Sequence, residues 1–340
     1  MPRRRVLVVR LDADGDVLLA GPAVRAVATA ADVVLLVGPR GRQAAGLLPG
    51  VADVIEWSAP WIEPAPAPRV TQQHLDLLVQ RVRAAAVDEA VVLTSFHQSA
   101  LPTALLLRLA GVGRVTAISD DYPGALLDTR VVDPGDVPEP VRGLTVAASA
   151  GFVLPDSDDG RLAVRRPLPD TTALAGPSGY VVLHPGASVP ARAWPADRWA
   201  QTARALVSCG LRVVVTGGQH ECDLTSEVCD GNDARDLGGR TTMPQLAGVL
   251  DRAASVVVAN TGPAHLAAAV GTPVVSLFAP TVPAARWAPY GVRLQLLGDQ
   301  EAPCRGSRAT SCPVPGHPCL TRVSADDVVR ALHGLEEDVA

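Results

Sequence analysis

The sequence contains no lysine, so arginine supplies all 30 of the basic residues. Any cation that binds phosphate must therefore be Arg or His. Aromatic residues make up only 3 % of the chain, which leaves Val, Leu and Ala to build the core. This composition suits short buried strands packed between alanine-rich helices. The net charge of -5 carries no electrostatic footprint for nucleic acid, and we expect no nucleic-acid partner.

We expect neither a signal peptide nor a membrane-spanning segment. The apolar run that begins after residue 5 is interrupted by aspartates from residue 12 onward. Residues 253–285 carry no charged side chain, but their prolines and glycines would break a spanning helix. The six cysteines do not form a secreted disulfide framework in a chain of this size. We expect a cytoplasmic protein, and we leave open peripheral contact with the inner face of the membrane.

Short β-branched runs alternate with helical patterns along the whole chain, which predicts an α/β fold with parallel sheets. Two Rossmann-like halves in tandem fit this pattern better than one sheet. We predict domains at residues 1–160 and 175–325, with residues 156–179 as the linker. A final helix within residues 326–340 could pack back on the first domain.

Three aspartates, Asp12, Asp14 and Asp16, follow the first predicted strand, residues 5–10, with Gly15 between the last two. Ligands gather at the carboxyl ends of parallel strands. Gly15 would permit a tight turn, and Asp16 would then stand at the start of a helix, where it could simply cap it. Three carboxylates exceed what a cap requires. Like charges this close raise one another's pKa, as a general base near neutrality needs.

Two further clusters follow strands of the second half. Residues 184–188 read His-Pro-Gly-Ala-Ser, and Arg192 comes shortly after. Small residues let backbone N–H groups approach an anion, and Arg192 can neutralise phosphate charge. Residues 216–221 form a glycine-rich turn that ends in Glu221. The Glu221 carboxylate could cap the next helix or accept a ribose hydroxyl, and spacing alone does not choose.

The most specific cluster is Asn260-Thr261-Gly262-Pro263-Ala264-His265, which follows a predicted strand. Pro263 at the first helical position would align the next helix. We expect the N–H groups of Thr261, Gly262 and Ala264 to point at one spot, where a helix N-terminus favours a pyrophosphate. His265 could contact the phosphates or satisfy the buried turn.

Three cysteines and one histidine gather near the end of the sequence, at Cys304, Cys312, His317 and Cys319. This set could satisfy tetrahedral zinc. The paired C-x₂₋₄-C knuckle is absent, however, and a disulfide or free thiols are the alternatives. We predict no metal site and no cofactor.

Taken in order, these motifs resemble glycosyltransferase family 9, the ADP-heptose:lipopolysaccharide heptosyltransferases. The resemblance rests on Arg10…Gly15-Asp16-Val17…Pro22, His184-Pro185-Gly186-Ala187-Ser188…Arg192-x-Trp194-Pro195, Gly217-x₃-Glu221 and Asn260-Thr261-Gly262-Pro263-x-His265-Leu266. The cysteine-rich tail is also similar to a segment of that family.

This resemblance implies a GT-B fold, two Rossmann-like domains with a deep cleft between them. It implies inversion at the anomeric carbon, no metal requirement and an ADP-linked sugar donor. It also assigns roles: Asp16 as the catalytic base, Asp14 and Gly15 on the acceptor side, and Ser188, Arg192, Glu221, Thr241, Met243, Asn260, Thr261, Gly262 and His265 around the donor. In that assignment Glu221 accepts the ribose hydroxyls, and the backbone near Thr241 and Met243 reads the base.

Two positions depart from the family pattern. The family usually carries Lys where Arg192 stands, a mild change because Arg keeps the charge. It usually carries Asp where Asn260 stands, and loss of that carboxylate leaves the donor sugar open, a heptose or a related sugar. The acceptor, a hydroxyl of a glycan, glycolipid or small molecule, and the oligomeric state are also open. A GT-B-like nucleotide-sugar epimerase and a non-catalytic nucleotide-sugar-binding protein are the alternatives; a nicotinamide enzyme lacks its fingerprint here.

Overall fold

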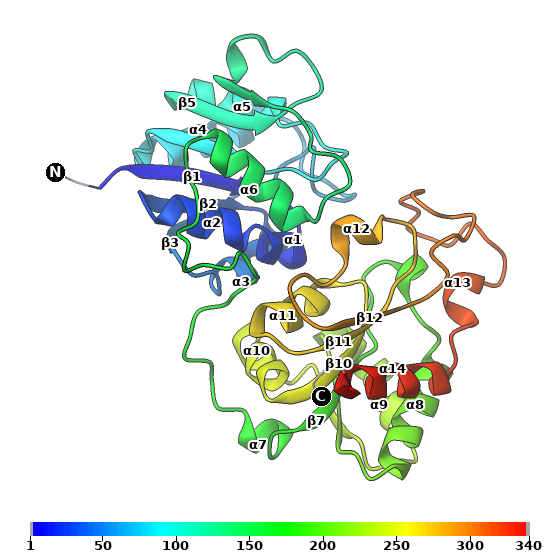
Figure 1. The fold of residues 1–340 in the computed structure, drawn as a ribbon. Helices are drawn as coiled ribbons and strands as arrows, with labels where there is room; N and C mark the ends of the chain where they lie inside the picture. The colour runs from blue at the N-terminus through cyan, green and yellow to red at the C-terminus, as the bar shows by residue number, and fades with distance from the viewer. Residues whose placement is uncertain (1–2, 338–340) are drawn as a thin grey trace. The chain divides into compact units, whose positions relative to one another are not determined.

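The computed structural model describes residues 3–337 and forms two compact units that divide between Arg165 and Arg166 (Figure 1). The division falls inside the expected linker. Residues 1, 2 and 338–340 of the predicted domain ranges lie outside the described part. The first residues of the expected linker are not a free segment, because Arg25 Nε and Nη2 donate to the Asp158 carboxylate at 2.6 and 2.8 Å.

The first unit is a six-stranded parallel sheet in the order β3-β2-β1-β4-β5-β6. Its strands are β1 (Arg5–Arg10), β2 (Asp32–Val37), β3 (Val51–Glu56), β4 (Glu89–Val92), β5 (Arg114–Ile118) and β6 (Thr129–Val131). Its helices are α1 (Asp14–Leu19), α2 (Gly21–Ala28), α3 (Arg42–Ala45), α4 (Gln72–Ala84), α5 (Leu101–Leu109) and α6 (Glu139–Ser149). Figure 1 shows α2 and α6 together on one face of the sheet and α4 with α5 on the other.

Residues 14–28 form two helices, α1 and α2, that divide at Ala20. Pro22 lies in the first turn of α2, where its missing N–H cannot continue the hydrogen bonds of α1. α1 begins at Asp14, so Asp16 lies inside the helix and does not cap it; Ala13 occupies the N-cap position.

The second unit repeats the same strand order on its own six parallel strands, β12-β11-β10-β7-β8-β9. Its strands are β7 (Tyr180–His184), β8 (Val213–Gly217), β9 (Arg235–Gly238), β10 (Ala253–Ala259), β11 (Val274–Leu277) and β12 (Leu294–Leu297). Its helices are α7 (Thr172–Ala175), α8 (Ala196–Ser208), α9 (Cys222–Cys229), α10 (Met243–Asp251), α11 (Gly262–Val270), α12 (Ala284–Trp287), α13 (Pro318–Thr321) and α14 (Ala325–Glu337). Counted within each unit, both sheets follow the doubly wound order 3-2-1-4-5-6 of the Rossmann fold.

The last helix, α14, packs against α8, β11 and β12. Val328, Leu332 and Leu335 on its inner face are buried in the core of the second unit. The apolar stripe of this helix therefore completes the core of the second unit, and its packing on the first domain stays a prediction. None of the helices described for residues 3–337 is both long and apolar enough to cross a membrane.

Candidate active site

The exit of β1 in the first unit holds a buried guanidinium surrounded by acids. Arg10, only 3 % exposed, places Nη2 2.8 Å from Asp16 Oδ1, Nε 3.0 Å from Asp12 Oδ2 and Nη1 3.4 Å from Glu139 Oε2. Burial opposes the charge, but these carboxylates outweigh it and raise the pKa of Arg10 above its usual value. Nη2 also donates to Ser95 Oγ at 2.9 Å. The network fixes Asp16 on one side while 24 % of its side chain stays exposed.

Asp12 takes part in this network and is itself buried. Its Oδ1 accepts a hydrogen bond of 2.6 Å from Gln98 Nε2, and Gln98 Oε1 in turn accepts from the Ser95 N–H. Burial raises the pKa of Asp12, Arg10 lowers it and the neighbouring Asp16 raises it again. The like-charge effect expected from the sequence is present at Asp12, although burial is the larger cause.

Asp14 and Gly15 do not take the arrangement that the sequence suggested. Asp14 Oδ1 accepts the Ala44 N–H at 2.9 Å, which ties α1 to α3, and burial raises the pKa of this carboxyl. Gly15 lies buried within α1 and not in a left-handed turn, so the predicted tight turn is wrong. Helix α1 starts at Asp14, two residues before the start at Asp16 that such a turn would give.

Two buried residues at the start of α6, Glu139 and Arg142, were not predicted from the sequence. Glu139 lies 129 positions from Arg10 in the chain, yet it is 4 % exposed and paired with that guanidinium. Arg142 is equally buried, donates to the Thr94 carbonyl and lies 3.4 Å from Asp133 Oδ2. The only sequence signal near these residues is the pair of prolines at the start of α6. These prolines predict where a helix begins, but they indicate no functional role.

In the second unit, the exits of β7 and β8 bring His184 and Glu221 together. His184 Nδ1 lies 2.9 Å from Thr216 Oγ1, and its Nε2 lies 4.0 Å from Glu221 Oε2. Burial lowers the pKa of His184 to about 4, and Glu221 only partly opposes this. The imidazole is therefore neutral near pH 7 and can exchange hydrogen bonds without adding charge.

Glu221 caps the turn that follows β8, and its carboxylate lies against the residues that follow β7. Its Oε2 accepts the Gly218 N–H at 2.7 Å, which is the capping alternative left open by the sequence. The carboxylate also occupies the space above Gly186, where any Cβ would collide with it. A side chain at position 186 would therefore require the Glu221 carboxylate to move away from its present place.

Arg192 follows the exit of β7, and its side chain reaches the motif that begins at Asn260. Its Nη1 donates to the Asn260 carbonyl at 3.4 Å, so the structure joins these two predicted donor residues. Asn260 is 3 % exposed, and its Nδ2 makes no hydrogen bond within residues 3–337. A buried amide donor of this kind costs free energy unless a ligand satisfies it.

Helix α11 begins at Gly262 with Thr261 as its N-cap and Pro263 in its first turn, as the motif predicts. The Ala264 N–H, however, donates to the Thr261 carbonyl at 3.1 Å. The prediction that this N–H group points at an anion is wrong, because the group is already hydrogen-bonded within the tight first turn of the helix. His265 is 4 % exposed on the same helix.

The remaining predicted residues are less closely tied to this group. Ser188 is exposed beyond the exit of β7, while Thr241 and Met243 are partly exposed at the start of α10. Their carboxyl-end positions agree with the expected edge of the sheet.

Within residues 3–337, no group of three or more His, Cys, Asp and Glu side chains is arranged to hold a metal ion. All six cysteines are free thiols. Burial, followed by the neighbouring Cys304 and Cys312, raises the pKa of Cys319 to about 12. The His317 ring is engaged elsewhere, with Nε2 3.1 Å from the Ala191 carbonyl.

Two Rossmann-like units in one chain, each with polar motifs at its strand exits, define the GT-B architecture of sugar-nucleotide enzymes. Residues 77–316 match the model of "Glycosyltransferase family 9 (heptosyltransferase)", and the chain belongs to this family. The Asp16 region lies outside that match.

Lipopolysaccharide heptosyltransferase 3 of Escherichia coli (strain K12) is 34 % identical over 114 residues, 32 % of this chain and 33 % of that protein. The chain therefore aligns with only about a third of the length of this curated relative. The structure of E. coli ADP-heptose lps heptosyltransferase II superposes with a TM-score of 0.75 at 19 % identity, covering 99 % of this chain and 100 % of that one. E. coli heptosyltransferase WaaC with ADP-2-deoxy-2-fluoro heptose gives 0.72 at 20 % identity, covering 97 % and 99 %. These likenesses show the GT-B fold.

Proposed function

We propose that this protein is an inverting glycosyltransferase that moves a heptose or related sugar from an ADP-linked donor to a hydroxyl of a glycan or glycolipid. Two polar sites, one within each unit, carry the proposal. One is an oriented carboxylate, Asp16, at the exit of β1. The other is a cationic, small-residue site formed by Arg192, Asn260 and the start of α11.

In the proposed reaction Asp16 accepts the proton of the acceptor hydroxyl as that oxygen attacks the anomeric carbon. The bond between the anomeric carbon and the diphosphate oxygen breaks, and its electron pair leaves with the diphosphate. Arg192 and the N-terminus of α11 stabilise this growing negative charge. A general base of this kind contributes about 10²–10⁴ in rate.

The donor assignment draws on two kinds of support. The matched family is named for heptosyltransferases, and one structural neighbour was solved with an ADP-linked fluoro-heptose. Asn260 presents an amide in place of a carboxylate at the sugar. An amide both donates and accepts hydrogen bonds, so it changes which sugar hydroxyls it can satisfy. Arginine as the charge-stabilising group also supports a reaction without a metal ion.

The proposal is tested by incubating the protein with nucleotide-linked sugars and glycan or glycolipid acceptors, with products detected by mass spectrometry. We expect a glycosylated acceptor together with a free nucleoside diphosphate, and unchanged turnover in a chelator. An isomerised donor without acceptor would indicate an epimerase. Donor binding without any conversion would indicate a binding protein, and either result would reject the transferase.

A further inference from the structure

A segment near the end of the chain, residues 306–320, is hydrogen-bonded to the turn at residues 190–194; we refer to it as the strap. At its start the Gly306 and Arg308 N–H groups each donate at 2.8 Å, to the carbonyls of Pro280 and Thr281 beyond β11. At its end Leu320 is fully buried in the core of the second unit. The strap is therefore anchored at both ends although most of its residues are exposed.

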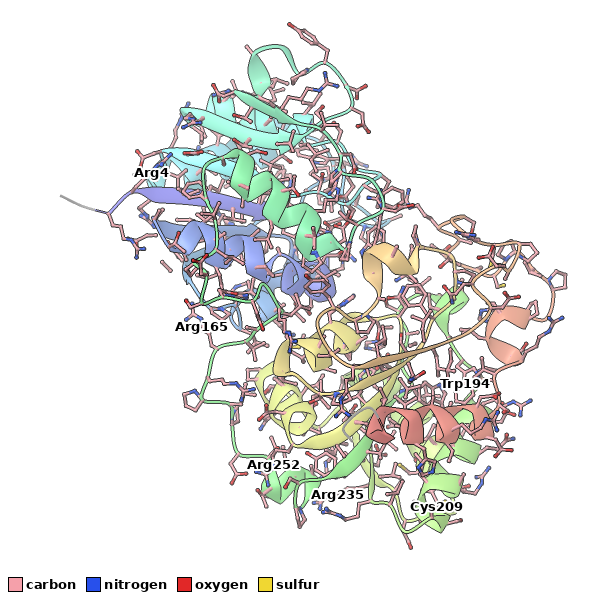
Figure 2. The ribbon with its side chains drawn as sticks, viewed as in Figure 1. Arg4, Arg165, Trp194, Cys209, Arg235 and Arg252 are labelled. Carbon is pink, nitrogen blue, oxygen red and sulfur yellow. The ribbon has the colours of Figure 1, made fainter. Side chains whose placement is uncertain are left out.

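The strap holds the turn that carries Arg192. The Ala191 N–H donates to the Thr310 carbonyl at 2.9 Å, and the Ala191 carbonyl lies 3.1 Å from His317 Nε2. Further along, the indole N–H of Trp194, labelled in Figure 2, donates to the Leu320 carbonyl at 3.1 Å. Both backbone polar groups of Ala191 are thus satisfied by the strap, and Ala191 itself is completely buried.

The protonation and the backbone conformation of His317 both suit its contact with the Ala191 carbonyl. A carbonyl can only accept, so His317 Nε2 must carry the proton and donate. The residue adopts a left-handed backbone with φ of +50° at the N-cap of α13. Non-glycine residues rarely adopt this conformation, although His and Asn are enriched among those that do. Cys319 and Leu320, which follow shortly after, are buried in the core of the second unit. Their burial fixes the backbone position from which the His317 ring extends.

Arg192 follows Ala191 directly in the chain, and its Nη1 donates to the Asn260 carbonyl at 3.4 Å. The backbone position of Ala191 sets the point from which the Arg192 side chain extends toward this carbonyl. Placement errors of about 1 Å can cost on the order of 10²-fold in enzyme sites.

We propose that His317 is a positioning residue for Arg192, acting through the Ala191 carbonyl, so that the strap sets the affinity for the donor diphosphate. This inference rests on the proposed function for its ligand, a nucleoside diphosphate. It assigns the histidine of the cysteine-rich tail to this hydrogen bond and not to a metal.

Three variants separate the side-chain hydrogen bond from the backbone. His317→Asn tolerates the left-handed conformation but is too short to reach the Ala191 carbonyl. His317→Gln carries an N–H at a similar reach, and His317→Ala removes the donor. Arg305→Ala, which lies just outside the strap and loses only an exposed pair with Glu301, is the matched control.

Calorimetry with ADP, GDP, UDP and dTDP supplies the first readout. For the nucleotide that binds wild type, we expect His317→Ala and His317→Asn to raise Kd by about three- to tenfold, the worth of one neutral hydrogen bond. His317→Gln should restore most of the affinity, and Arg305→Ala should not change it. Wild-type affinity in His317→Asn, alongside weakened binding in Arg192→Ala, would overturn the positioning role while leaving the proposed function intact.

Hydrogen exchange of a peptide that covers residues 189–194 supplies a readout that needs no ligand. We expect the Ala191 amide to exchange at least several times faster in His317→Ala than in Arg305→Ala, since the strap satisfies it. Unchanged exchange would overturn the inference. If wild type binds none of the four nucleotides, the donor assignment fails, and the exchange result still decides whether His317 holds the turn.

Discussion

Arg10 Nη2 lies 2.8 Å from Asp16 Oδ1, and the same guanidinium reaches Glu139 on α6 and Asp12 on the loop after β1. One buried cation thereby joins two distant segments of the first unit and fixes the carboxylate proposed as the base. Because Arg10, Asp12 and Glu139 are all at least nine-tenths buried, the charges depend on one another for solvation.

Replacing Arg10 with Met should leave buried carboxylates without their cation. We expect a loss of about 3–5 kcal/mol in the free energy of unfolding at pH 7, as for other broken buried pairs. The raised pKa of Asp12 would rise further without Arg10, so this carboxyl protonates readily as the pH falls. The deficit should then shrink toward pH 4, measured by urea denaturation.

Adding Glu139→Gln to Arg10→Met provides the control, because it removes one stranded charge. The double variant should recover part of the lost stability at pH 7. A deficit that is the same at pH 7 and pH 4, and unaltered by the second substitution, would contradict the account of this network.

Asp16→Asn should lower turnover by about 10²–10⁴ while the fold is retained, because the amide cannot accept the acceptor proton. Donor affinity should not change, since the donor motifs belong to the second unit. The measurement compares steady-state transfer and calorimetric nucleotide binding. Asp53→Asn, an exposed carboxylate of the same unit, serves as the control. Wild-type turnover in folded Asp16→Asn protein would remove Asp16 from the mechanism.

His184 should make the protein less stable in acid. Its pKa of about 4 lies below the ordinary value of 6.5, so the folded state resists protonation. Its contribution is complete above pH 6.5 and is lost as the pH falls toward 4, at most about 3 kcal/mol at 1.36 kcal/mol per pH unit. The difference in unfolding free energy between wild type and His184→Asn should shrink over that window. A constant difference from pH 7.5 to pH 4 would show that His184 does not titrate in this way.

Much of the fold could be predicted from the sequence because its strands are short, apolar and bounded by turns. The strand at residues 5–10 has the predicted bounds. Pro22 is a sequence signal for the division between α1 and α2. The regular spacing of apolar residues on both sides of it, however, is typical of one continuous helix. The final helix could not be assigned to a unit, because an apolar stripe does not specify which core it completes.

The candidate site was predictable only in part, for a related reason. Residues that follow strands, such as Asp16 and Glu221, can be found because parallel strands bring their carboxyl ends to one edge. Glu139, and the contact that His317 makes with Ala191, could not be predicted in the same way. Glu139 reaches Arg10 from a helix 129 positions away, and His317 reaches Ala191 from 126 positions away. Such contacts arise only when the chain has folded.

The most direct test of the central claim measures nucleoside diphosphate binding by calorimetry and thermal denaturation, on wild type and Arg192→Ala. The account predicts that ADP binds wild type and stabilises it by about 2.7 kcal/mol at a hundredfold excess over Kd. Arg192→Ala should weaken this binding by roughly ten- to a hundredfold, the worth of a charge-assisted hydrogen bond. Failure of ADP, GDP, UDP and dTDP alike to bind wild type, or equal binding to both proteins, would contradict the donor site.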